Sequence, residues 1–335
     1  MTDWFVNNTR GILISVAIAL AGMLISHVVG GPAVLYAMMI GLAFHYLSEN
    51  PNVRPGMEFC IGPVLRIGVA LLGVRITAEE LSHLTPLTLA VIVGGVFATI
   101  GFSVLIRRLV GMEKGDSALV GGSVAICGAS AAIALSLVMD KKQLKEQTLL
   151  AVLVVVTVIS TVAMLLYPLI LEFTPLSGSV AGLVLGGSIH DVSQVVGAGA
   201  MMGEDALATA TMTKMLRVAM LVPMIVIFAF AFKPKAEEND GEPKKFNLMR
   251  VIPKFLIAFV ILAVVNVMGY IPKEAASYLV EISHFCVLVA IAALGMKTSL
   301  SRLRTAGVTV LYLLTIDTVF LFIWVLGGIW LAQLV

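Results

Sequence analysis

Two apolar segments of the chain carry glycine and small polar residues where a lipid-facing helix would carry bulky side chains. The first, residues 117–139, contains Gly121, Gly122, Ser123, Cys127, Gly128 and Ser130. Glycine costs a helix about 1 kcal/mol relative to alanine, and interrupted backbone in hydrocarbon needs protein or a water-filled cavity beside it. Because the N–H groups of a half-helix favour anions, we predict a substrate seat here. Close helix packing is the alternative explanation.

The second segment, residues 178–200, is the most polar membrane stretch and contains Ser188, His190, Asp191, Ser193 and Gln194. A histidine beside an aspartate can hold or pass a proton near neutral pH, which predicts a coupling role for His190 and Asp191. Hydroxyl and amide groups, here Ser188 and Gln194, can bind an oxyanion. The alternative is that His190 and Asp191 cap a helix end at the water interface.

Ionisable residues within membrane segments are expensive and are functional hypotheses by default. Arg66 lies some seven residues into its apolar segment, or roughly 10 Å deep, and Lys214 and Arg217 lie at similar depth in theirs. Forked guanidinium groups suit a compact oxyanion, so all three are predicted to bind substrate. The alternatives are snorkelling to the interface or pairing with an acid such as Asp191. Asp317 is interpreted as a helix contact.

The composition indicates a polytopic membrane protein. Of 335 residues, 59% are hydrophobic and only 13% are charged, values outside those of soluble domains. A net charge of +2 excludes a nucleic-acid partner. The cysteines Cys60, Cys127 and Cys286 show no paired spacing, and the histidines show no metal-binding motif. We expect no metal, no cofactor and no enzyme site.

Eleven segments are candidates to cross the bilayer, approximately residues 11–29, 32–48, 59–76, 86–109, 117–139, 147–171, 178–200, 206–232, 251–270, 278–296 and 306–334. The distribution of Lys and Arg predicts a cytoplasmic N-terminus, a cytoplasmic loop over 233–254 and a periplasmic C-terminus. The basic run at 141–145 violates this rule. The violation would vanish if 117–139 and 178–200 were re-entrant hairpins, one from each side.

An internal repeat predicts the domain organisation. The run Leu65 to Leu71 resembles Leu216 to Leu221 five segments later, and an odd offset inverts orientation. We therefore expect an N-terminal helix (1–30) and two inverted five-helix repeats (31–172 and 173–335) with broken helices crossing at the midplane. A competing match relates Val120 to Val124 with Leu185 to Ile189, and Leu72 to Arg75 with Leu294 to Lys297.

The motifs at Gly122 to Ala131 and Ser188 to Val196 resemble the bacterial YeiH-like family, which is named for sulfate export. The resemblance covers nearly the whole chain, including Lys214 and Arg217. It implies a multi-pass inner-membrane protein related to the bile acid sodium symporter and cation–proton antiporter superfamily, with inverted five-helix repeats and crossing broken helices.

The expected function is a secondary transporter that moves a small sulfur oxyanion or organic sulfonate by alternating access, with a coupling proton or sodium ion. An anion channel, or a transporter of a small carboxylate, is the alternative. Expected partners are the anionic substrate, the lipid bilayer and a second copy in a homodimer. An intramembrane enzyme using Cys127 or His190 is disfavoured, because no nucleophile, base and orienting group are spaced for it.

Overall fold

The computed structural model describes residues 2–82, 84–140, 143–176, 178–232, 253–298 and 308–332. Every regular element in these ranges is a helix, which confirms the all-α membrane class. Seven segments are long and apolar enough to cross a bilayer. They comprise α1 (Thr2–Val29), α6 (Pro86–Ile106), α9 (Glu146–Glu172), α15 (Lys273–Lys297), α16 (Val308–Ala332) and two composite helices, α3 (Arg54–Phe59) to η3 (Leu72–Arg75) and α12 (Glu204–Ala219) with α13 (Leu221–Ala231).

The first composite helix changes geometry around a proline. Between α3 and α4 (Leu65–Leu71), the segment η2 (Cys60–Val64) is a π-helical turn that contains Pro63. Proline has no N–H to donate and its ring displaces the preceding turn. The wider turn leaves Gly62 with open space where a Cβ would be. Gly62 and Leu65, at and after this turn, line the cavity described below.

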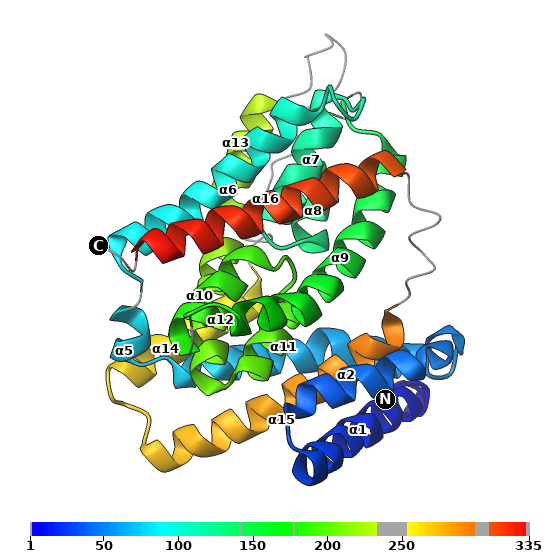
Figure 1. Cartoon of the computed structure of the whole chain (residues 1–335). Coiled ribbons are helices and arrows are strands. Elements are labelled where there is room, and N and C mark those ends of the chain that lie inside the picture. Colours follow the sequence, from blue (N-terminus) through cyan, green and yellow to red (C-terminus); the bar gives the residue numbers. More distant parts are fainter. Residues whose placement is uncertain are drawn as a thin grey trace.

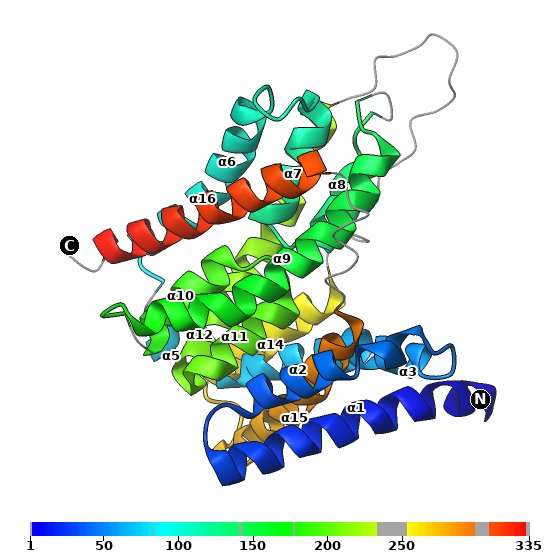
Figure 2. The same ribbon diagram turned by 45° about the vertical axis from the view of Figure 1, so that its right-hand side comes forward.

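The helices form two groups that lie one above the other (Figure 1). The helix panel consists of α1, α2 (Ala33–Ala43), α3 to η3, α14 (Lys254–Val267) and α15. The hairpin domain consists of α6, α7 (Lys114–Ala125), α8 (Ala129–Ser136), α9, α10 (Gly178–Ser188), α11 (Val192–Met202), α12, α13 and α16. The short α5 (Ala78–Ser82) connects them. The principal contacts between the groups are made by α11 and α12 against α2, α14, α15 and η3, and Figure 2 shows α10, α11 and α12 between the outer layers.

The segment 117–139 enters and leaves on the same face. Glu113, before α7, pairs with Lys145, after α8, at 2.9 Å. The backbone N–H of Lys145 also donates to Asp116 Oδ1 at 3.0 Å. A Cβ on Gly122 would lie 2.5 Å from Leu135, so α7 and α8 pack side by side. They form a re-entrant hairpin.

The segment 178–200 also turns back on itself, from the opposite face. Thr209 Oγ1 in α12 donates to Ser179 O at the start of α10, at 2.9 Å. A Cβ on Gly199, near the end of α11, would lie 2.8 Å from Leu207 in the same part of α12. Both ends of this hairpin therefore lie beside the start of α12. The sequence predicts broken helices that cross at the midplane. The structure instead has two re-entrant hairpins, because polar contacts hold the two ends of each segment on the same face.

The two faces of the protein differ in their number of lysine and arginine residues. We name them the Lys145 face, where α1 and α9 begin, and the Glu204 face, where α12 begins. The described basic residues near the Lys145 face are Arg10, Arg54, Arg107, Arg108, Lys114, Lys145, Lys254 and Lys297, against Arg75 and Lys273 near the Glu204 face. Lys141, Lys142 and most of the predicted 233–254 loop lie outside the described residues. With 117–139 re-entrant, Lys145 no longer violates the positive-inside pattern.

The inverted repeat of residues 31–172 and 173–335 stays a prediction. The positions of the broken helices differ from those that this pairing implies. That pairing relates 117–139 to 278–296, but α15 is continuous over Lys273–Lys297. The two breaks instead follow the runs related by the competing match, Val120 to Val124 and Leu185 to Ile189. The panel and the hairpin domain each combine helices from 31–172 and 173–335.

Candidate functional site

The tips of the two hairpins meet beside Lys214 and Arg217 of α12. Lys214 Nζ donates to Ile126 O at 2.7 Å and to Ile189 O at 3.0 Å. The Arg217 guanidinium donates to four carbonyl oxygens, those of Val124 (2.8 Å), Ala125 (2.9 Å), Ile189 (2.9 Å) and Gly186 (3.1 Å). Both side chains are fully buried. They bind the last carbonyls of α7 and α10, which a helix leaves unsatisfied and which carry partial negative charge.

Close packing of α10 on α12 makes these contacts reachable. A Cβ on Gly186 would lie 2.3 Å from Ala210 O, so only glycine permits this approach. The helix that carries both cations therefore lies directly against the hairpin whose carbonyls they bind. The glycines at 121–122 and 186–187 thus serve packing, while the breaks follow them at 126–128 and 189–191.

A cavity of about 320 Å³ lies between the hairpin tips and the panel. Its hairpin side is formed by Cys127, Ser130, Asp191 and Ser193 with neighbouring apolar residues, and its panel side includes Arg66 on α4. The lining extends to Pro253 and Lys297 at the Lys145 face. The cavity therefore reaches from the tips of the hairpins toward that face.

The two sides of the cavity carry opposite charges: Arg66 lies on the panel side and Asp191 on the hairpin side. Arg66 is exposed and has no ion pair or hydrogen bond within the described ranges. Gly128 is the N-cap residue of α8, and its φ of +66° favours glycine. As a glycine it provides no side chain to cap the helix. Asp191 caps α11 instead, accepting from Ser193 N at 2.9 Å and Ser193 Oγ at 2.5 Å. An anion would meet the unpaired guanidinium of Arg66 and the first turn of α8, in the same cavity as the Asp191 carboxylate.

Comparison with known proteins places the chain in a family. A family model described as Conserved hypothetical protein 698 matches residues 10–314. The chain belongs to this family. No solved structure matches it.

Three relatives are similar to the chain over most of its length and of their own. The chain is 38% identical to UPF0324 membrane protein CT0845 of Chlorobaculum tepidum, over 96% of this chain and 89% of the relative. It is 40% identical to UPF0324 membrane protein TauZ of Paracoccus denitrificans, over 95% and 94%. It is 30% identical to UPF0324 inner membrane protein YeiH of Escherichia coli, over 88% and 82%. The YeiH-like resemblance is thereby confirmed.

The predicted substrate-binding residues fall into two sets. Arg66, Cys127 and Ser130 line the cavity, with Gly128 between the last two in the chain. The others are buried away from it: Gly122 packs on Leu135, Ser123 Oγ donates to Val120 O, and Ser188 Oγ to Val184 O. Gln194 Nε2 donates to Thr161 at 3.4 Å, and Lys214 and Arg217 bind the carbonyls described above.

His190 also lies behind the cavity. It is fully buried and its Nε2 lies 2.8 Å from Thr318 Oγ1. Thr318 Oγ1 also lies 2.7 Å from Leu314 O, one turn earlier on the same helix. Asp317, on the same helix as Thr318, is also buried, and its carboxylate lies beside the Ser103 hydroxyl of α6. Of the predicted coupling pair, only Asp191 reaches the cavity.

Two polar residues of the cavity, Lys297 and Thr157, lie outside the segments in which ligands were predicted. Lys297 ends α15, and its one ion pair with a described residue is a long contact to Glu58, at 3.9 Å. Thr157 lies in the middle of α9. Lys297 resembles an ordinary interface lysine in the sequence, and Thr157 an ordinary helix hydroxyl. No group of three or more His, Cys, Asp or Glu lies together in the described part of the chain to hold a metal.

Proposed function

We propose that this membrane protein is a secondary transporter that moves a small sulfur-containing oxyanion or organic sulfonate by alternating access. The observation that carries the proposal is the cavity at the hairpin tips, which is lined both by unpaired Arg66 and by Ser130 in the first turn of α8. Charged donors and half-helix N-termini are the groups with which transporters hold anions. The resemblance to the sulfate-export family supports the sulfur oxyanion over a small carboxylate.

Asp191 is the proposed coupling group. Its carboxylate shares the cavity with the anion, and like charges in a confined site repel each other. A proton or a sodium ion bound at Asp191 would remove that repulsion and so favour loading of the anion. His190, bound to Thr318 behind the cavity, is not needed for this step.

Flux through reconstituted protein tests the proposal. Proteoliposomes loaded with sulfate, sulfite, thiosulfate or taurine should take up the same labelled anion by exchange, with a rate that saturates. A channel would instead pass the anion without saturation and without acceleration by anion on the opposite side. A thermal-shift screen identifies the anion first, because a ligand that binds only the folded state raises stability. Absence of both binding and exchange for all these anions and for carboxylates would contradict the proposal.

The charge distribution supports a second proposal, that the Lys145 face is cytoplasmic and the Glu204 face periplasmic. We expect single cysteines at Leu109 and Gln143, placed in a cysteine-free variant, to be protected from an impermeant maleimide in spheroplasts. A cysteine at Tyr270, on the loop before α15, should be labelled. Leu109 and Gln143 flank the α7–α8 hairpin, so both must behave alike. If one is labelled and the other protected, segment 117–139 crosses the membrane.

A further inference from the structure

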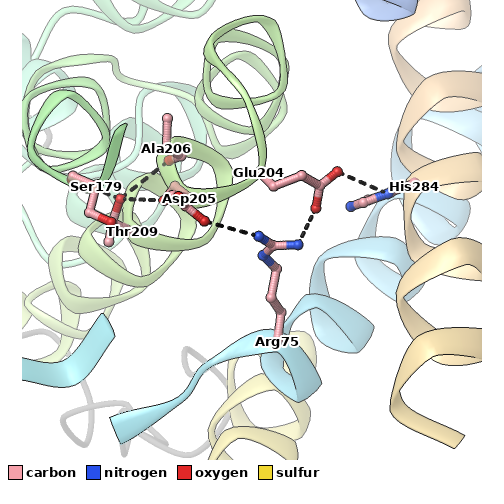
Figure 3. A network of polar contacts seen from close by, with 7 residues as sticks. All are labelled: Arg75, Ser179, Glu204, Asp205, Ala206, Thr209 and His284. Carbon is pink, nitrogen blue, oxygen red and sulfur yellow. Dashed lines mark hydrogen bonds and ion pairs between the residues drawn. The ribbon is translucent and has the colours of Figure 1, made fainter. Parts of the chain in front are cut away.

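A polar network joins the panel to the hairpin domain at the Glu204 face (Figure 3). Arg75, the last residue of η3, donates to Glu204 Oε2 and, at 3.4 Å, to Asp205 Oδ1. His284 Nδ1 on α15 lies 3.6 Å from the other Glu204 oxygen. Two panel elements, η3 and α15, are thus held against the first turn of α12.

The same turn of α12 is tied to the base of the second hairpin. Thr209 Oγ1 lies 2.9 Å from Ser179 O and 2.8 Å from Asp205 O, so its hydroxyl is shared between the two carbonyls (Figure 3). Displacement of Glu204 and Asp205 from Arg75 would therefore move α10 together with α12. The network links the panel to the hairpin that carries Asp191, rather than to an isolated loop.

A second cavity lies directly beside this network. It has a volume of about 480 Å³ and is lined by Glu204, Glu281 and His284 together with apolar residues of α1, α2, α11, α12 and α15. The two cavities lie at opposite ends of α11, since Ser193 lines the first and Ala200 the second. Between them, a Cβ on Gly197 would lie 3.2 Å from the buried Ile291 of α15. Tight packing of α11 on α15 thus separates them.

We propose that Arg75, Glu204, Asp205 and His284 form the gate of the transport pathway at the Glu204 face, and that this gate must separate before the hairpin tips can open to that face. The inference rests on the proposed alternating access. The structure has the anion cavity reaching the Lys145 face while this network holds the other face closed. The side chains of Glu204 and Asp205 are 55% and 71% exposed, and partly exposed ion pairs are weak enough to break and reform during a cycle.

Accessibility of the cavity tests the gate without requiring transport. Ser130→Cys, in a chain with the three native cysteines replaced by alanine, places a thiol in the anion cavity. In a chain with the gate broken by Arg75→Gln, labelling of this thiol from the Glu204 face should be at least threefold faster. The matched control is Arg54→Gln, which breaks a surface pair with Glu58 at 3.0 Å inside one helix and should change nothing. Equal labelling rates with and without Arg75 would overturn the gate.

A cross-link provides the second measurement. The pair Arg75→Cys and Glu204→Cys, joined by a short bismaleimide, should lower exchange at least tenfold. The same pair capped with N-ethylmaleimide should retain most of its flux, since it is modified but not joined. Full exchange by the cross-linked protein would overturn the gate. If no tested anion is transported at all, the labelling result still decides whether the network closes the Glu204 face.

Discussion

Replacing Arg217 with methionine should destabilise the folded protein by about 3–5 kcal/mol, because a buried polar network loses one partner and is left uncompensated. Four carbonyl oxygens at the tips of α7 and α10 would lose their donor, in a membrane interior with no water to replace it. For a chain of this size, the loss corresponds to a fall in Tm of roughly 10 °C. Thermal unfolding of purified protein in detergent measures it.

Arg217→Lys is the matched control. Lysine keeps the charge but loses the planar fork that reaches both hairpin tips, so its Tm should lie between those of the wild type and Arg217→Met. Folded Arg217→Lys should bind the anion with a Kd within about threefold of the wild type, or under 1 kcal/mol, because Arg217 does not line the cavity. A variant of unchanged Tm but strongly weakened binding would instead make Arg217 a substrate ligand.

Much of this architecture could be predicted from the sequence, because glycine and small polar residues in an apolar segment signal a broken helix. The basic run at 141–145 also indicated the re-entrant arrangement, since a crossing segment would place it on the wrong side. Hydropathy alone could not decide whether each of these segments crosses the bilayer or turns back. The reason is that α7, α8, α10 and α11 are each too short to span it alone, and two of them in sequence could do either. The contacts of Asp116 with Lys145 and of Ser179 with Thr209 decide it.

The roles of the arginines could not be separated by sequence. Arg66 and Arg217 occur in similar local runs and at comparable depth, yet one is exposed at the cavity and the other is fully buried. The difference comes from neighbours distant in the chain. Arg217 lies between two sets of helix carbonyls, while Arg66 lines the cavity between the panel and the hairpin tips. A buried cation in a membrane segment has a role in structure or function. Only its contacts show whether it binds the substrate or stabilises the fold.

Arg66→Gln should weaken anion binding by 10- to 100-fold with little change in stability. A charged donor to an anion contributes about 1.5–3 kcal/mol, which corresponds to that range of Kd. Since Arg66 is exposed and has no partner among the described residues, its loss strands no buried group, and Tm without ligand should shift by less than about 2 °C. Titration of purified protein with whichever of sulfate, sulfite, thiosulfate or taurine stabilises the wild type gives both values.

Arg54→Gln separates this effect from a general loss of positive charge at the Lys145 face. Arg54 belongs to the same composite helix, pairs with Glu58 and has a side chain that is 65% exposed, but it does not line the cavity. Charges beyond about 10 Å are largely screened at moderate salt, so Arg54→Gln should leave Kd within about twofold of the wild type. An equal loss of affinity in both variants would indicate nonspecific attraction, and unchanged affinity in Arg66→Gln would place the anion elsewhere. Only a selective loss at Arg66 locates the bound anion between α4 and the start of α8.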